Sequence, residues 1–113
     1  ARIIKTGTAG TTVTKIYVNT SSSLVGATQL ATVTNGATLV FIAPIRHFLI
    51  KSSTNTEGIL SSLSSNGDFV GGFAVARTST NIDWTVDQYI IISIQNGSAA
   101  DSTLCSWFQL DKK

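Results

Sequence analysis

Few side chains in this sequence could perform acid–base, nucleophilic or metal chemistry. The chain has one histidine, His47, one cysteine, Cys105, and six acidic residues. General acid–base catalysis needs titratable groups held together. Most of the acidic residues lie in or beside expected turns, where aspartate is favoured by its hydrogen bonds to backbone. No nucleophile-elbow motif is present. We therefore expect no catalytic residue and no enzymatic activity.

Metal and cofactor sites have equally little support. A structural zinc site is built from several Cys or His ligands, and His47 and Cys105 are far apart in the sequence. No glycine-rich phosphate loop follows a strand and opens a helix. We expect neither a metal nor a cofactor within one chain. An ion gathered on the symmetry axis of an oligomer is the one arrangement left open.

Aromatic side chains with polar neighbours are the better candidates for ligand contacts. Saccharide rings stack on flat apolar faces and are oriented by amide and carboxylate groups. Trp84 lies in the polar run 78–85, which we expect to form a loop, so Asn81 and Asp83 lie beside it in the sequence. Trp107 lies in an expected strand. We predict ligand-binding roles for Trp84, Asp83, Asn81 and Trp107. The alternative is that each tryptophan covers the end of a core.

Composition indicates a surface rich in hydroxyl groups rather than charges. Charged residues make up 12% of the chain and hydrophobic residues 42%, whereas soluble domains carry about 25% charged residues. Serine and threonine supply much of the remaining polarity, which is typical of extracellular and virion-surface β proteins. The net charge is +2 and the basic residues are scattered, so no nucleic-acid partner is expected. No apolar run approaches the roughly 20 residues of a membrane helix.

Length and strand patterning predict one domain over residues 1–113. Three Asn-Gly pairs, at 35–36, 66–67 and 96–97, are strong hairpin signals because both residues tolerate positive φ. We expect an antiparallel β-sandwich, jelly-roll-like, of about eight strands, with Pro44 at a corner. One short helix is expected at Gly58–Leu63, after the candidate caps Asn55 and Thr56. The expected strands cover residues 3–6, 11–18, 29–34, 37–43, 45–51, 69–77, 89–94 and 103–110.

Several expected strands are apolar on both sides. In 89–94 and 103–110, apolar residues occupy both alternating rows, and a sandwich core covers only one of them. The second row needs cover from a loop or from another subunit. We therefore predict an oligomer, with His47, Arg46 and Tyr89 at its interface. His47 and Arg46 lie in the apolar run 45–50, and Tyr89 opens one of the doubly apolar strands.

The whole chain resembles in style the knob or head domains that end bacteriophage tail fibres, tail needles and receptor-binding proteins. The resemblance rests on the Asn-Gly pairs, the low charge and the closing strand 103–110, and it carries over no site residues. It implies the C-terminal knob of a longer chain, at the virion surface or outside cells. This knob would form a homotrimer that binds a host surface saccharide or protein receptor without catalysis and without inserting into a membrane. The alternatives are a carbohydrate-binding module or small lectin, and a structural capsid, pilus or spike component.

Overall fold

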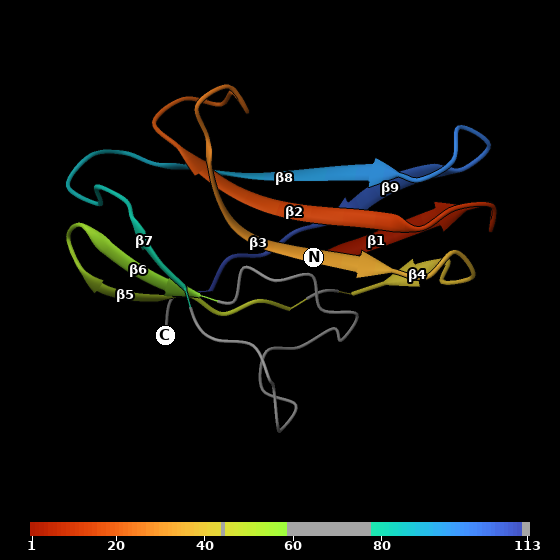
Figure 1. Cartoon of the computed structure of the whole chain (residues 1–113), viewed down its shortest axis with the longest axis horizontal. Helices are drawn as coiled ribbons and strands as arrows, with labels where there is room; N and C mark the ends of the chain where they lie inside the picture. The colour runs from red at the N-terminus through yellow and green to blue at the C-terminus, as the bar shows by residue number, and fades with distance from the viewer. Residues whose placement is uncertain (44, 59–77, 112–113) are drawn as a thin grey trace.

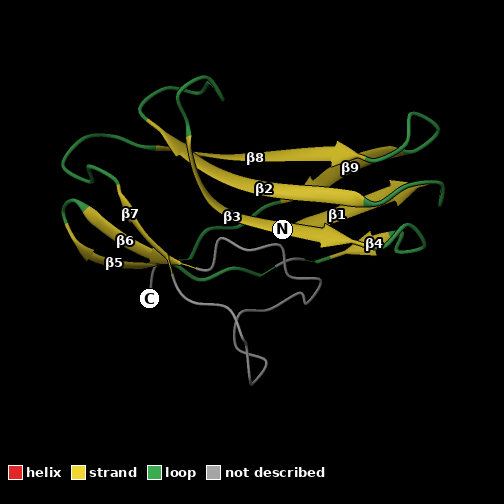
Figure 2. Cartoon of the chain, in the orientation of Figure 1, coloured by secondary structure: helices red, strands yellow, loops and turns green. Residues whose placement is uncertain are grey.

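The computed structural model describes residues 1–43, 45–58 and 78–111, which form nine β-strands in three antiparallel sheets (Figure 1). Within these ranges the chain forms strands and loops but no helix (Figure 2). The described residues accordingly contain no helix that could cross a membrane. The all-β prediction is confirmed. These three small sheets do not establish the expected jelly-roll arrangement of about eight strands.

The longest strands form the sheet with the order β3-β2-β8. It consists of β2 (Thr12–Asn19), β3 (Thr28–Asn35) and β8 (Tyr89–Asn96). Alternation in β2 follows the sequence pattern, since Thr12, Thr14 and Val18 are buried and the residues between them are less so. A register shift after Ile16 lets β3 bury two successive residues, Leu30 and Ala31. A bulge of this kind adds one residue to a strand and so interrupts the alternation of buried and exposed side chains along it.

The second sheet joins the two ends of the chain. Its order is β4-β1-β9, with β1 (Arg2–Thr6), β4 (Phe41–Ile42) and β9 (Ser102–Trp107). Ile3 and Lys5 of β1 are buried, and the residues on either side of them are exposed. One row of this sheet therefore faces the interior and the other row faces solvent.

The third sheet has the order β5-β6-β7 and lies at the left end of the molecule in Figure 1. It is formed by β5 (Leu49–Ser52), β6 (Asn55–Gly58) and β7 (Thr78–Asn81). Ile82, which follows β7, packs with Val18 of β2 and Leu30 of β3 in a buried cluster. The cluster is flanked by Phe48, Trp84 and Ile90. This apolar contact ties the end of β7 to the β3-β2-β8 sheet.

Two of the predicted Asn-Gly hairpins do not form. A two-residue type I′ turn needs positive φ at both central residues, but among the described residues only Gly7 and Gly26 have positive φ. After Asn35-Gly36 the chain leaves its sheet and enters β4, which pairs with β1. After Asn96-Gly97 it enters β9, which also pairs with β1. These Asn-Gly pairs mark crossings between sheets.

Two further predictions on local structure were wrong. Asn55 and Thr56, expected as helix caps, lie in β6, where they pair with β7 residues Asn81 and Thr80. The polar run expected as a loop begins instead with strand β7. Pairing with neighbouring strands outweighs weak local preference at both places. The third Asn-Gly pair, Pro44, the strand expected at 69–77 and most of the expected helix lie outside the described residues.

Candidate binding pocket and exposed apolar face

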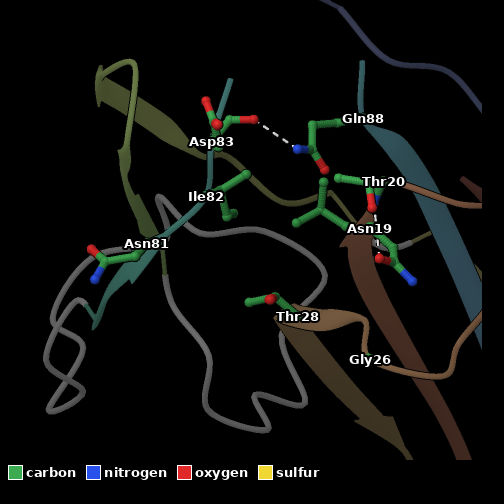
Figure 3. A pocket seen from close by; sticks show the side chains of 9 residues that line it. Asn19, Thr20, Gly26, Thr28, Asn81, Ile82, Asp83 and Gln88 are labelled. Atoms are coloured by element: carbon green, nitrogen blue, oxygen red, sulfur yellow. Dashed lines mark hydrogen bonds between the residues drawn. The ribbon is translucent and has the colours of Figure 1, made fainter. Parts of the chain in front are cut away.

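A small pocket lies where β2 ends, β3 begins and β7 runs into the segment 82–88 (Figure 3). Its volume is about 120 Å³, smaller than the roughly 300–1,000 Å³ of drug-sized ligand sites. Ile82 lies at its centre in Figure 3, and Val18 and Gly26 also line it. The remaining lining residues carry amide, hydroxyl or carboxylate groups, and they are Asn19, Thr20, Thr28, Asn81, Asp83 and Gln88.

One wall of the pocket is the loop 20–27 between β2 and β3, and Asn19 holds it in place. The Asn19 side-chain amide donates to the carbonyl oxygens of Ser23 at 2.8 Å and Val25 at 3.1 Å. Its side-chain oxygen accepts a bond of 2.9 Å from the Thr20 amide. Gly26 adopts a φ of 76°, which residues other than glycine rarely adopt. The loop is therefore ordered by its own hydrogen bonds.

The opposite wall is organised around Asp83. Its Oδ1 accepts hydrogen bonds from the hydroxyl of Thr85 and, at 2.9 Å, from the Thr85 amide. These two bonds hold the pKa of the Asp83 carboxyl below its usual value, the hydroxyl contributing most. The side-chain amide of Gln88 donates to the Asp83 carbonyl oxygen at 2.7 Å. The pocket thus presents an ionised carboxylate at neutral pH.

The predicted ligand-binding residues are divided by the structure. Asn81 and Asp83 both line the pocket, although the Asn81 side chain points away from its centre in Figure 3. Trp84 is half-buried and packs against the cluster formed by Val18, Leu30 and Ile82. Its indole N–H donates to the Thr56 hydroxyl at 2.6 Å. Trp84 therefore supports the pocket from behind, as in the alternative interpretation of that residue.

The other predicted residues are not among those that line this pocket. Trp107 is 52% exposed at the end of β9, opposite Arg2 in register. Arg46 and His47 precede β5, and Tyr89 opens β8 opposite Asn19 and is 51% exposed. Thr28 and Gln88 line the pocket but were not predicted, because their polar side chains carry no local motif. They can be identified as lining residues only from the structure, in which the loop 20–27 and the segment 82–88 meet.

A contiguous apolar row crosses the outer face of the β4-β1-β9 sheet. Phe41, Ile4 and Leu104 are direct register partners across the three strands. Such partners have Cβ atoms roughly 5 Å apart on one face. Their exposed fractions are 59%, 41% and 63%. We call these three residues the apolar row. Contiguous exposed apolar surface of this kind marks interaction sites.

A buried ion pair lies on the inner side of the same sheet. The Lys5 Nζ is 3.1 Å from the Asp101 Oδ2, and both side chains are fully buried. Lys5 also donates to the carbonyl oxygens of Gly10 and Ala37. The amides of Ala9 and Gly10 donate to the Asp101 carboxylate. The pair joins the β1–β2, β3–β4 and β8–β9 connections. No local sequence signal pairs a lysine with an aspartate at the opposite end of the chain.

The balance of forces on Asp101 keeps it ionised. Burial of the carboxyl raises its pKa. The hydrogen bonds from the Ala9 amide, the Lys5 ammonium and the Gly10 amide together lower the pKa by more than burial raises it. The net result is a pKa below the usual value. Within the described ranges, no group of three or more His, Cys, Asp or Glu side chains is gathered to hold a metal ion.

Comparison with known proteins gives no relative for this chain: no family model, curated protein or solved structure matches it.

Proposed function

We propose that this chain is a non-enzymatic attachment domain that forms a homotrimer on a virus particle and binds a saccharide or a protein on the host cell. In this proposal the three sheets belong to a jelly-roll-like knob at the C-terminal end of a longer chain, at the virion surface or outside cells. The bacteriophage setting and the number of subunits come from the resemblance in style. The outer surface of the β4-β1-β9 sheet supports assembly.

The apolar row is the observation that carries the proposal. Phe41, Ile4 and Leu104 cross a sheet face that is open to solvent. An antiparallel sheet with apolar residues on both faces needs cover on both. The chain is poor in charge, with 12% charged residues, and a low density of charged groups favours the core of a subunit interface. A further copy of the chain would supply this cover.

Assembly would also make weak receptor binding effective. A shallow polar site binds with a dissociation constant of about 1 mM. Linking several copies raises the avidity by roughly 10²–10⁴ without any new contact. A trimer of weak sites would therefore hold a particle on a cell surface that displays many copies of one receptor.

The same apolar row supports a second candidate, a structural component of a capsid, pilus or spike. In that case the exposed apolar surface serves assembly only, and no receptor is bound. A carbohydrate-binding module or small lectin acting as a monomer is favoured instead by the polar pocket. The oligomeric mass and a glycan array together separate the three functions.

The experiment replaces the two most exposed members of the apolar row. The F41T/L104T variant keeps strand-forming residues and replaces the two most exposed side chains of the apolar row. We expect its oligomer to dissociate in sedimentation velocity, and its retention on a glycan array or on intact bacterial cells to fall by roughly 10²-fold. The control is L49T, which changes another exposed leucine, on β5 in a different sheet. An oligomer that F41T/L104T leaves intact would contradict the proposal.

A further inference from the structure

We propose that the pocket between the loop 20–27 and the segment 82–88 binds a single ring of a neutral saccharide and excludes acidic saccharides. This inference rests on the proposed attachment function and names the receptor class for its binding site. The pocket is lined almost entirely by polar atoms, and Ile82 and Val18 lie beneath that lining and are nearly fully buried. The hydroxyl groups of a sugar ring match a polar lining of this kind.

The rim keeps hydrogen-bonding atoms that the protein does not use. Of the two Asp83 carboxylate oxygens, Oδ1 accepts from Thr85, and the described residues place no donor on Oδ2. Gln88 uses its amide nitrogen on the Asp83 carbonyl oxygen, which leaves its side-chain oxygen available. Thr28 contributes a hydroxyl that can both donate and accept. These groups suit adjacent hydroxyls of one ring, each of which donates one hydrogen bond and accepts others.

Charge decides which saccharides fit. Asp83 is the charged residue among those lining the pocket, and no lysine, arginine or histidine is found among them. Hydrogen bonds from Thr85 lower the pKa of the Asp83 carboxyl, so it is ionised at neutral pH. A carboxylate, sulfate or phosphate group on the ligand would meet this charge without a compensating cation. Neutral rings avoid the repulsion and gain a charge-assisted hydrogen bond.

The walls of the pocket are already ordered before a ligand binds. Asn19 fixes the loop 20–27 through its amide. On the other side, the Ile82 amide donates to the Thr54 carbonyl oxygen at 3.2 Å, and the Trp84 amide donates to the Ser53 carbonyl oxygen at 2.7 Å. Pre-ordered walls lower the entropic cost of binding. A small site of this kind can therefore reach millimolar affinity with few contacts.

The test is a ¹⁵N–¹H NMR titration of the whole chain with methyl glycosides of glucose, galactose, mannose and N-acetylglucosamine. The acidic arm uses N-acetylneuraminic acid and glucose 6-sulfate. We expect at least one neutral glycoside to shift the resonances of Thr28, Ile82 and Gln88 with a dissociation constant of about 1 mM, and the acidic probes to shift none of them. Shifts confined to other residues, or no shift with neutral probes at 50-fold higher concentration, about 50 mM, would overturn the inference.

Two variants assign the effect to the rim. D83N keeps an oxygen for Thr85 but loses the charge, so neutral binding should weaken about fivefold and the exclusion of acidic probes should relax. T28V removes one hydroxyl from a strand position that tolerates valine, and it should weaken binding even if D83N does not fold. The matched control is D87N, an exposed aspartate of the same segment that does not line the pocket. Equal effects of D83N and D87N would refute the assignment.

The outcome can be separated from that of the proposed function. An oligomer that binds no neutral glycoside would contradict the saccharide inference but would remain compatible with attachment to a protein receptor. A monomer that binds a neutral glycoside in this pocket would sink the trimeric attachment domain and favour the small lectin.

Discussion

Replacing Lys5 with methionine removes the cation from the ion pair that joins the two ends of the chain. The side chain is fully buried, and its Nζ donates to Asp101 at 3.1 Å and to the Ala37 carbonyl oxygen at 2.7 Å. A third donated bond goes to Gly10. Methionine fills a similar volume with no charge and no donor. The Asp101 carboxylate then stays buried with two backbone amides and no counter-ion.

The expected loss is large for a domain of this size. Removing one partner of a buried ion pair costs about 3–5 kcal/mol, because the other charge is left uncompensated. The free energy of unfolding of a small domain is about 5–15 kcal/mol. We therefore expect Lys5→Met to remove between about a fifth and most of the stability, and to lower Tm on the order of 10–20 °C. The fold itself should survive at low temperature.

The assay is urea unfolding followed by tryptophan fluorescence, with all variants at the same protein concentration. Lys15→Met is the control, because Lys15 is a half-buried lysine of β2 with no part in the ion pair. It should change the free energy of unfolding by less than about 0.5 kcal/mol. The double variant K5M/D101N removes both charges but keeps a side-chain oxygen that can accept from the Ala9 or Gly10 amide, so it should be more stable than K5M alone. A K5M variant as stable as K15M, or a double variant less stable than K5M, would refute the reasoning.

Acid should destabilise the fold through the same ion pair. Folding lowers the pKa of the Asp101 carboxyl, so the ionised carboxylate stabilises the folded state above the ordinary aspartate pKa of about 3.9. This stabilisation is lost as the pH falls through the lowered value, so urea midpoints should stay level above about pH 4 and drop as the pH falls further. Of the three variants Gly7→Ala, Gly26→Ala and Gly36→Ala, the first should destabilise most in thermal unfolding, since φ at Gly7 is 97° and an added Cβ would collide with the Asp101 carboxylate. Gly26→Ala meets only the strain of a positive φ and should cost about 1–2 kcal/mol, and Gly36→Ala meets neither. The reverse order of Tm values would contradict this account. Thr56→Val removes the acceptor of the Trp84 indole and should cost about 1–3 kcal/mol, with a change in the tryptophan emission of the folded state. An unchanged spectrum and unchanged stability would show that this hydrogen bond is absent in solution.

The sequence was informative where structure follows from local alternation. The spacing of Thr12, Thr14 and Val18 places them on one side of a strand, because successive strand residues point to opposite faces, and the structure shows that this side is the buried one. The all-β class followed from the same pattern. Pairing between strands distant in sequence was not predictable in this way. The Asn-Gly pairs at 35–36 and 96–97 pointed to hairpins, yet their strands pair with β1 and β2.

The candidate site was predictable only in part. Asn81 and Asp83 were picked for their polar character beside a tryptophan, and both line the pocket. Trp84 itself turns inward, because its indole finds an acceptor in Thr56 and its ring an apolar cluster. Thr28 and Gln88 could not have been selected. Their place in the pocket depends on how two loops from different strands meet.

The solution mass of the unmodified chain tests the central claim most directly. Sedimentation equilibrium at micromolar concentration, repeated at higher salt, would give this mass without reference to molecular shape. An apolar contact between subunits is screened little by salt. We predict a single species of about three times the 11.9 kDa of one chain, unchanged by salt. A mass of 11.9 kDa at every concentration would show that water covers the apolar row, and it would contradict the assembly on which the proposed function depends.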